Sequence, residues 1–141
     1  MTSTYPIFQL YSPPRDAKIK VIHCECFSAA YSNSASAEYT IPEGTYVYDV
    51  VVHLATGDNN YGGEAHNYAQ VKVNGTIAAK VRSWAVEGGT ARYSDRLFFS
   101  LLSNMTLTQD TTIRLEVSTE GNGNTYHIAW SWAEAWIIYK G

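Results

Sequence analysis

Hydrophobic and polar residues alternate along most of this chain, with the two-residue period of β-strands. The clearest case is residues 112–118, where Ile113, Leu115 and Val117 alternate with polar or charged neighbours. No stretch shows sustained helical periodicity. Turn residues such as Pro42-Glu43-Gly44 separate the alternating segments at short intervals. The pattern therefore predicts an all-β protein.

Eight or nine short strands at this spacing are typical of an antiparallel β-sandwich of the jelly-roll type. The segments that we expect to form the main strands are 18–27, 37–41, 45–54, 67–73, 77–84, 96–103, 112–118 and 126–139. We find no internal repeat and no linker between domains. We therefore predict one sandwich domain over residues 17–141, preceded by an apolar arm over residues 1–16.

The last predicted strand has no polar face. One side carries Ile128, Trp130, Trp132, Glu134, Trp136 and Ile138. The other side carries Ala129, Ser131, Ala133, Ala135, Ile137 and Tyr139. A strand that is apolar on both faces must be covered on both faces. Because small side chains suit the close approach of another backbone, we predict that the second set forms the interface of an oligomer.

The hairpin around Asn74-Gly75 contains a conflict between two rules. Asn-Gly favours a two-residue loop, which pairs Val73 with Thr76. The apolar pattern instead places Val71 and its neighbours on the same face as Ala79, and this register needs one more residue in the loop. We therefore predict an unusual loop or a β-bulge in this hairpin.

Composition and charge narrow the function. The formal net charge of −3 disfavours nucleic acid as a partner. No apolar run approaches the roughly 20 residues that insert across a membrane. The first residues lack the features of a signal peptide. We therefore expect synthesis in the cytoplasm, followed by incorporation at a particle surface or release without a signal peptide.

The two cysteines, Cys24 and Cys26, lie two residues apart on a predicted strand and share a face. A disulfide between them would be strained, so we predict buried free thiols. A zinc site with His23 and Glu25 is the alternative, but these two side chains point to the opposite face and no second ligand pair follows. We predict no metal site here.

Two loops carry the residues that we predict to bind a ligand. The longest polar interruption, residues 56–64, is punctuated by glycine and rich in amide side chains, and such loops often carry function. Aromatic rings in these loops can stack on a sugar, although packing or solvation is the simpler explanation of each of them. The predicted ligand-binding residues are Asp58, Asn59, Asn60, Tyr61, His66, Trp84 and Tyr93. Calcium is an alternative ligand of the first loop, but its spacing matches no known calcium loop, and we predict no cofactor.

Sequence motifs of catalysis are missing from the chain. We find no nucleophile elbow, no zinc-protease helix motif and no phosphate-binding loop. Asp49 and His53 share a strand face but stand roughly 13 Å apart, which is too far for direct proton transfer. The expectation is a protein that is not an enzyme and has no catalytic residues.

Four segments follow one another in a recognisable order: residues 41–48 as the start of a central strand, 69–75 as a strand ending in Asn-Gly, 107–117 as a penultimate strand, and 132–139 as a closing strand. In this order the chain resembles the C1q/tumour-necrosis-factor-like jelly roll. The resemblance implies a compact homotrimer with strands of one sheet near the axis. Viral and phage fibre tips and surface proteins use sandwiches of this kind.

Together these observations lead to one expected function and two alternatives. We expect a non-enzymatic homotrimeric module on a phage or viral surface or tail fibre, which binds a cell-surface glycan or protein receptor. The first alternative is a decoration protein that cements a capsid shell. The second is a free soluble lectin.

Overall fold

The computed structural model describes residues 14–28, 31–58, 66–84, 94–121 and 128–141. These residues form eight strands. The strands are β1 (Ala17–Ser28), β2 (Asn33–Ile41), β3 (Tyr46–Asp58), β4 (His66–Val73), β5 (Thr76–Trp84), β6 (Ser94–Thr106), β7 (Thr111–Thr119) and β8 (Ala129–Lys140). The described part contains no helix long and apolar enough to span a membrane.

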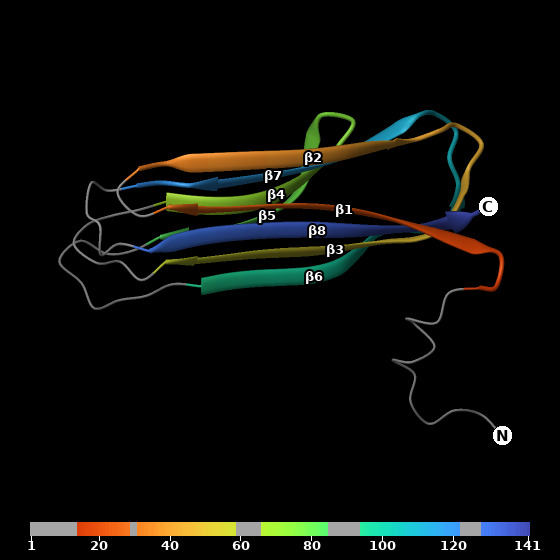
Figure 1. The fold of residues 1–141 in the computed structure, drawn as a ribbon. Helices are drawn as coiled ribbons and strands as arrows, with labels where there is room; N and C mark the ends of the chain where they lie inside the picture. The colour runs from red at the N-terminus through yellow and green to blue at the C-terminus, as the bar shows by residue number, and fades with distance from the viewer. Residues whose placement is uncertain (1–13, 29–30, 59–65, 85–93, 122–127) are drawn as a thin grey trace, which may run out of the picture.

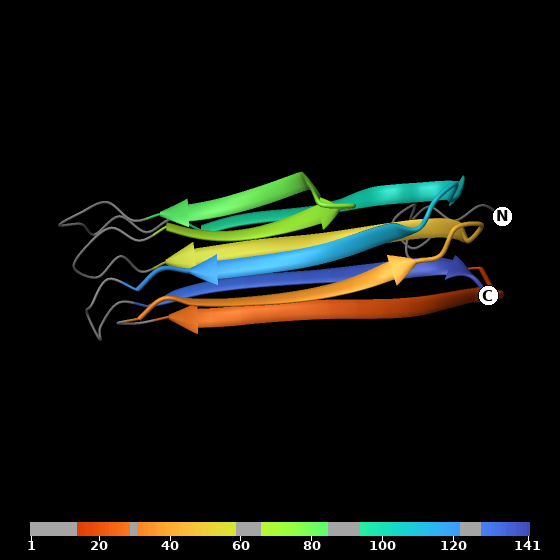
Figure 2. The same ribbon diagram turned by 90° about the horizontal axis from the view of Figure 1, so that it is seen from above.

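The strands form two antiparallel sheets that lie face to face (Figure 1). Sheet A has the order β1-β8-β3-β6, and sheet B has the order β2-β7-β4-β5. The start of β1, the β2–β3 turn and the end of β8 lie at the same end of the sandwich (Figure 2). Connections that repeatedly cross from one four-stranded sheet to the other are those of a jelly roll. The predicted fold class, an all-β jelly-roll sandwich, is confirmed.

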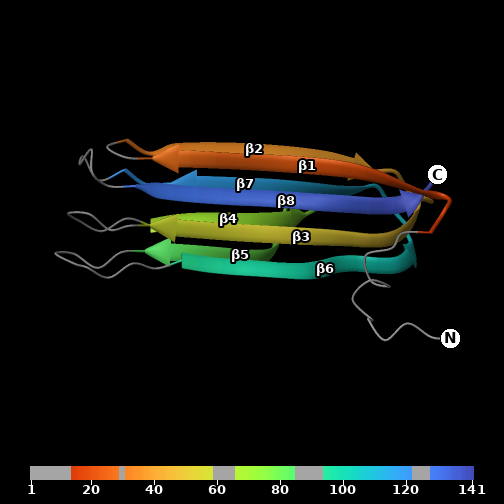
Figure 3. The same cartoon turned by 60° about the horizontal axis from the view of Figure 1, so that its bottom comes forward.

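The core lies between the two sheets, where the strands of one layer run over those of the other (Figure 3). Alternation along each strand sends every second side chain into this space. The clean pattern of β7 behaves as predicted, because Ile113, Leu115 and Val117 are buried. Val52 and Leu54 of β3 lie in the same core from the other sheet.

The small residues of β8 also face this core. Ala129, Ser131, Ala133, Ala135 and Ile137 are almost completely buried within a single chain. The hydroxyl of Ser131 donates a hydrogen bond across the core to the carbonyl oxygen of Ser118 on β7, at 3.0 Å. Small side chains on β8 leave room for the branched side chains of sheet B.

The interface that we predicted from the sequence is therefore misplaced. Sheet B of the same chain covers the small face of β8, so a second copy cannot cover it. Tyr139, the last member of that predicted set, is half-buried where the sandwich opens at its end. The large residues of β8 form the open side instead.

The β4–β5 hairpin satisfies both the Asn-Gly turn rule and the register of the apolar residues. Val73 pairs with Thr76 across a two-residue turn, in which Asn74 and Gly75 both have positive φ. One residue later the register shifts, and Val71 pairs with Ala79. The predicted bulge is confirmed. It lets the tight turn coexist with an apolar face that points inward.

Cys24 and Cys26 are buried free thiols, as predicted. Burial raises the pKa of the Cys24 thiol to about 11. His23 and Glu25 point to the opposite side of β1, where they are much more exposed. No cluster of metal-ligating side chains occurs among the described residues.

The outer face of sheet B is polar and centred on Glu116 of β7. The carboxylate of Glu116 contacts the Lys72 ammonium at 2.8 Å and the Arg114 guanidinium at 3.1 Å, and it accepts a hydrogen bond from the Gln70 amide at 2.8 Å. The Lys72 hydrogen bond, followed by those of Gln70 and Arg114, lowers the pKa of Glu116 from 4.5 to about 2. The Arg114 guanidinium also contacts the Glu38 carboxylate of β2 at 3.2 Å, so the network joins β2, β7 and β4 on the solvent side.

Replacing Glu116 with glutamine is expected to lower the free energy of unfolding at neutral pH by about 1–2 kcal/mol. Because the folded state lowers this pKa, the stabilisation is complete above pH 4.5 and is lost as the pH falls towards about 2. Urea unfolding at several pH values measures both effects. Glu38→Gln is the matched control, because Glu38 is more exposed and, among the described residues, forms its one ion pair with Arg114. Equal losses in the two variants would contradict the prediction.

Candidate interaction face

The outward side chains of sheet A form one apolar surface, which we call the aromatic face. Alternation along β8 sends its small residues inward, so the large residues between them point out of the sandwich. Antiparallel pairing places outward residues of β1, β3 and β6 beside them. The apolar and aromatic members of this face are Ile19, Val21, Phe27, Val51, His53, Phe98, Trp130, Trp132, Trp136 and Ile138.

One row of this face crosses all four strands. His23 of β1 stands opposite Glu134 of β8, Glu134 opposite His53 of β3, and His53 opposite Phe98 of β6. Side chains that are directly opposed in a sheet have Cβ atoms about 5 Å apart, which is close enough for direct contact. Residues far apart in the sequence therefore act as one surface.

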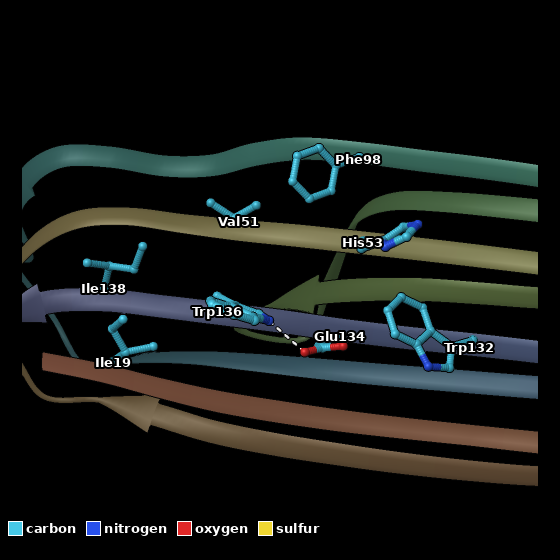
Figure 4. A pocket seen from close by; sticks show the side chains of 8 residues that line it. All are labelled: Ile19, Val51, His53, Phe98, Trp132, Glu134, Trp136 and Ile138. Atoms are coloured by element: carbon cyan, nitrogen blue, oxygen red, sulfur yellow. Dashed lines mark hydrogen bonds between the residues drawn. The ribbon is translucent and has the colours of Figure 1, made fainter. Parts of the chain in front are cut away.

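A groove of about 300 Å³ runs along the middle of the aromatic face (Figure 4). Its lining comes from all four strands of sheet A. The lining residues are Ile19, Val51, His53, Phe98, Trp132, Glu134, Trp136 and Ile138. Two of them carry ionisable groups and the others are apolar or aromatic. The groove is suited to an apolar side chain of a partner.

The large side chains of this face are open to solvent in a single chain. Trp136 is 47% exposed, Phe98 is 51% exposed and Phe27 is 57% exposed. Contiguous exposed apolar patches larger than a few hundred Å² usually mark interaction sites. The outer face of sheet B, with its ion pairs around Glu116, has the opposite character. This contrast identifies the aromatic face as the candidate site.

Glu134 orients the aromatic side chains beside it. The indole nitrogen of Trp136 donates a hydrogen bond to Glu134 Oε1 at 2.6 Å (Figure 4). The other oxygen, Oε2, lies 3.8 Å from His23 Nδ1. The carboxylate thus satisfies the polar edge of the indole and leaves the rest of the ring for apolar contact.

His53 is the polar residue most enclosed by rings. Its imidazole makes edge contacts with Trp132, at 4.6 Å between ring centroids, and with Phe98, at 5.6 Å. Its Nε2 atom is buried without a hydrogen-bond partner in the described part of the chain. Desolvation, followed by the positive charge of Arg96, lowers the pKa of His53, whereas the charge of Glu134 acts in the opposite direction. The imidazole is therefore held in its neutral form at neutral pH.

Trp130 extends the aromatic face towards the end of β8. It stands opposite Gly57 of β3, and a Cβ atom at Gly57 would lie 2.3 Å from the indole ring. The absence of a side chain at Gly57 is what lets this ring lie against the backbone of β3.

The predicted ligand-binding residues fall into three groups: one is described in full, two are described by their backbone alone, and four lie outside the described residues. Asp58 is buried and accepts a hydrogen bond from the Asn67 side chain at 3.0 Å. His66 and Trp84 are backbone partners at one end of the β4–β5 hairpin, but their side chains are outside the described part. Asn59, Asn60, Tyr61 and Tyr93 lie outside the described residues altogether.

Sequence reasoning missed the aromatic face as a site, although it recognised one of its strands. The signal in the sequence was the row of three tryptophans at spacing two in β8. The sequence does not show which residues of β1, β3 and β6 lie beside these tryptophans. Those neighbours are fixed by strand order and by two register irregularities in β3, near Val47 and Val50.

No protein-family model and no curated protein matches this chain. Solved structures to which this chain is similar include dimeric latent PorU from Porphyromonas gingivalis. The identity is 12%, the TM-score is 0.48, and the match covers 91% of this chain and 13% of that chain. A second is the structure of infectious bursal disease virus, Gx strain. The identity is 15%, the TM-score is 0.38, and the match covers 89% of this chain and 32% of that chain. A third is the structure of TmCBM61 in complex with β-1,4-galactotriose. The identity is 12%, the TM-score is 0.37, and the match covers 99% of this chain and 97% of that chain.

This chain therefore spans only 13% of the length of the PorU structure and 32% of the viral one. TM-scores below 0.5 at these identities carry no inference about ligand or function. Because no family model matches, membership of the C1q/tumour-necrosis-factor-like superfamily stays a prediction.

Proposed function

We propose that this chain is a non-enzymatic homotrimeric jelly-roll module whose copies associate through the aromatic face. The observation that carries the proposal is the contrast between the outer faces of the two sheets. Sheet A presents exposed tryptophan, phenylalanine and isoleucine side chains, whereas sheet B presents ion pairs. Tryptophan is enriched among the residues that dominate protein–protein binding energy.

The size of the aromatic face supports a second copy of the chain as its partner. Strands β1 and β8 each have 12 residues. At roughly 3.3 Å per residue and about 4.8 Å between strands, a four-stranded face of this length covers roughly 600–750 Å². A standard protein–protein interface buries about 800 Å² on each partner. One whole face of sheet A is therefore close to the area that one specific interface buries on each partner, and in a trimer each copy divides this area between its two neighbours.

The trimeric state follows from the resemblance to the C1q/tumour-necrosis-factor-like jelly roll, in which strands of one sheet lie near the axis. In such an assembly each recognition site is repeated three times around the axis. Weak contacts with a glycan or protein receptor then gain about 10²–10⁴ in strength through multivalency. This arrangement suits a receptor-binding protein at the surface of a virus or phage.

Analytical ultracentrifugation tests the assembly. The wild-type chain is expected to sediment as a trimer at micromolar concentration, and Trp136→Lys is expected to sediment as a folded monomer. The expected loss in association is at least 100-fold, because an ammonium replaces a ring at the centre of the groove. A wild-type monomer would overturn the proposal, and a wild-type dimer would overturn its trimeric state.

Ile77→Lys is the matched control. Ile77 belongs to sheet B and is 49% exposed, which is close to the 47% of Trp136. The same change of an exposed apolar residue to lysine is expected to leave the sedimenting mass unchanged. Loss of the trimer in both variants would show that the effect of Trp136→Lys is not specific to the aromatic face.

A further inference from the structure

A second cavity lies at the end of the sandwich where β1 starts and β8 ends. Figure 2 shows that these two ends of the strands lie at the same end of the sandwich. We call it the tyrosine cleft. It has a volume of about 560 Å³, which is within the range of small-molecule sites. It is lined by Lys18, Tyr39, Ile41, Pro42, Glu43, Gly44, Thr45, Tyr46, Tyr139, Lys140 and Gly141. Both sheets and the β2–β3 turn contribute, so the cleft is a feature of the folded single chain.

Three tyrosines from three strands converge on the cleft. Tyr39 comes from β2, Tyr46 from β3 and Tyr139 from β8, and all three are half-buried. Tyr39 and Tyr139 pack against the hydrophobic core, which fixes the positions of their rings. None of the three hydroxyl groups forms a hydrogen bond with a described residue. The cleft thus combines aromatic surface with hydroxyl groups that are available to a ligand.

The charged side chains that line the cleft are two lysines and one glutamate. The carboxylates of Asp110 and Asp16 lie nearby, where they accept hydrogen bonds from the Glu43 amide and the Tyr48 hydroxyl. Lys18 and Lys140 are exposed on its lining, and Glu43 is the one acidic side chain there. The ammonium of Lys20 lies 5.4 Å from the centre of the Tyr39 ring and adds to the positive charge nearby. A ligand that carries a carboxylate would form charge-assisted hydrogen bonds with such lysines.

The backbone of the cleft is fixed by hydrogen bonds. The Gly44 amide donates to the Leu107 carbonyl, and the Leu107 amide donates to the Thr45 carbonyl, both at 2.9 Å. The Glu43 amide donates to the Asp110 carboxylate at 2.8 Å, and the Gly141 amide donates to the Asp16 carbonyl at 3.1 Å. A site that is ordered before binding loses little conformational entropy when a ligand enters.

We propose that the tyrosine cleft binds a single saccharide unit and prefers a sugar that carries a carboxylate. The rings stack on the C–H face of the sugar, and the phenolic hydroxyls bond its hydroxyl groups. Lys18 and Lys140 bind the carboxylate. This inference deepens the recognition role of the proposed function, but the cleft is complete in one copy and does not depend on the trimer.

Titration of the isotope-labelled full chain with two matched probes, followed by amide chemical shifts, tests the proposal. The probes are methyl β-D-glucuronide and methyl β-D-glucoside, which differ at one carbon. Both are expected to shift amides of residues 43–46 and 139–141 with millimolar Kd, and the glucuronide is expected to bind about three- to tenfold more tightly. No shift in these segments, or shifts confined to the opposite end of the sandwich, would overturn the proposal.

Conservative variants assign the binding to individual groups. Tyr139→Phe and Tyr46→Phe keep the rings but remove a hydroxyl, so each is expected to raise Kd about three- to tenfold. Lys18→Gln with Lys140→Gln is expected to remove the preference for the glucuronide. Tyr68→Phe is the matched control, since Tyr68 lies beneath Lys80 on sheet B, outside the cleft. A Kd unchanged by every cleft variant would overturn the assignment.

The same titration on Trp136→Lys separates the two proposals. The cleft does not include the aromatic face, so binding is expected to persist in the dissociated chain. A trimer without shifts in the cleft would remove the saccharide site and leave the assembly intact. A wild-type monomer that shows those shifts would remove the trimer and leave the saccharide site intact.

Discussion

Ala133→Glu is expected to unfold the domain. Ala133 is completely buried in the core, between Cys24 of β1 and Leu54 of β3. A carboxylate at this position would be enclosed by apolar side chains with no cation to pair with, at a cost of at least several kcal/mol. A typical domain is stable by only about 5–15 kcal/mol, so most of its stability would be lost. Circular dichroism during thermal unfolding measures the effect.

Trp132→Glu, one position earlier on the same strand, is the matched control. This side chain points outward from sheet A, so the introduced carboxylate stays in contact with water in the single chain. The variant is expected to remain folded and to lose the trimer. The opposite result, a folded Ala133→Glu that merely fails to assemble, would restore the small face as the interface.

The two faces of β8 show how far the sequence could predict the fold. The two-residue period alone identified β8 and β7 as strands. In β7 the charged residues Arg114 and Glu116 mark the outer side, and the direction of every side chain followed from them. In β8 both sides are apolar, so the pattern contains no polar side that marks solvent. Which side enters the core is decided by the volume that sheet B leaves free, and that is a tertiary property.

The candidate site was less accessible to sequence reasoning than the fold. Trp132 and Trp136 stood out at once, but Phe98 and His53 became their neighbours only when the strand order was known. The irregular pairing of β3 with β6 and β8 shifts each row by a residue, and a pattern on one strand cannot reveal it. The tyrosine cleft depends in the same way on the meeting of β2, β3 and β8.

The strength of the trimer is expected to fall steeply on mild acidification. His53 lies within the aromatic face, where association would bury it further beside the copies of Trp132 and Phe98. Its pKa is already lowered in the single chain, first by desolvation and then by Arg96, although Glu134 opposes this shift. Association should therefore favour the neutral form of the His53 imidazole over the protonated form.

The direction of the pH effect follows from this lowered pKa. The stabilisation is complete above the pKa that His53 has in the free chain, which already lies below the ordinary 6.5. It is lost as the pH falls through that lowered value, because free chains then bind protons that the trimer excludes. One proton per copy makes three per trimer, so the association constant can fall by up to about 1,000-fold per pH unit. Sedimentation from about pH 7.5 down to the lowest pH at which the chain stays folded measures this dependence. Circular dichroism over the same range checks that each chain stays folded.

His53→Phe separates this effect from every other titration on the aromatic face. A phenyl ring keeps the contacts with Trp132 and Phe98 but cannot accept a proton, so the trimer of this variant is expected to persist at acidic pH. His23→Gln is the control, because His23 also contacts Trp132 but is 38% exposed and lies within 4 Å of the carboxylates of Glu25 and Glu134. It is expected to keep the wild-type pH dependence. A wild-type trimer that is equally strong throughout this range would show that association does not bury His53, and the aromatic face would then lie outside the interface.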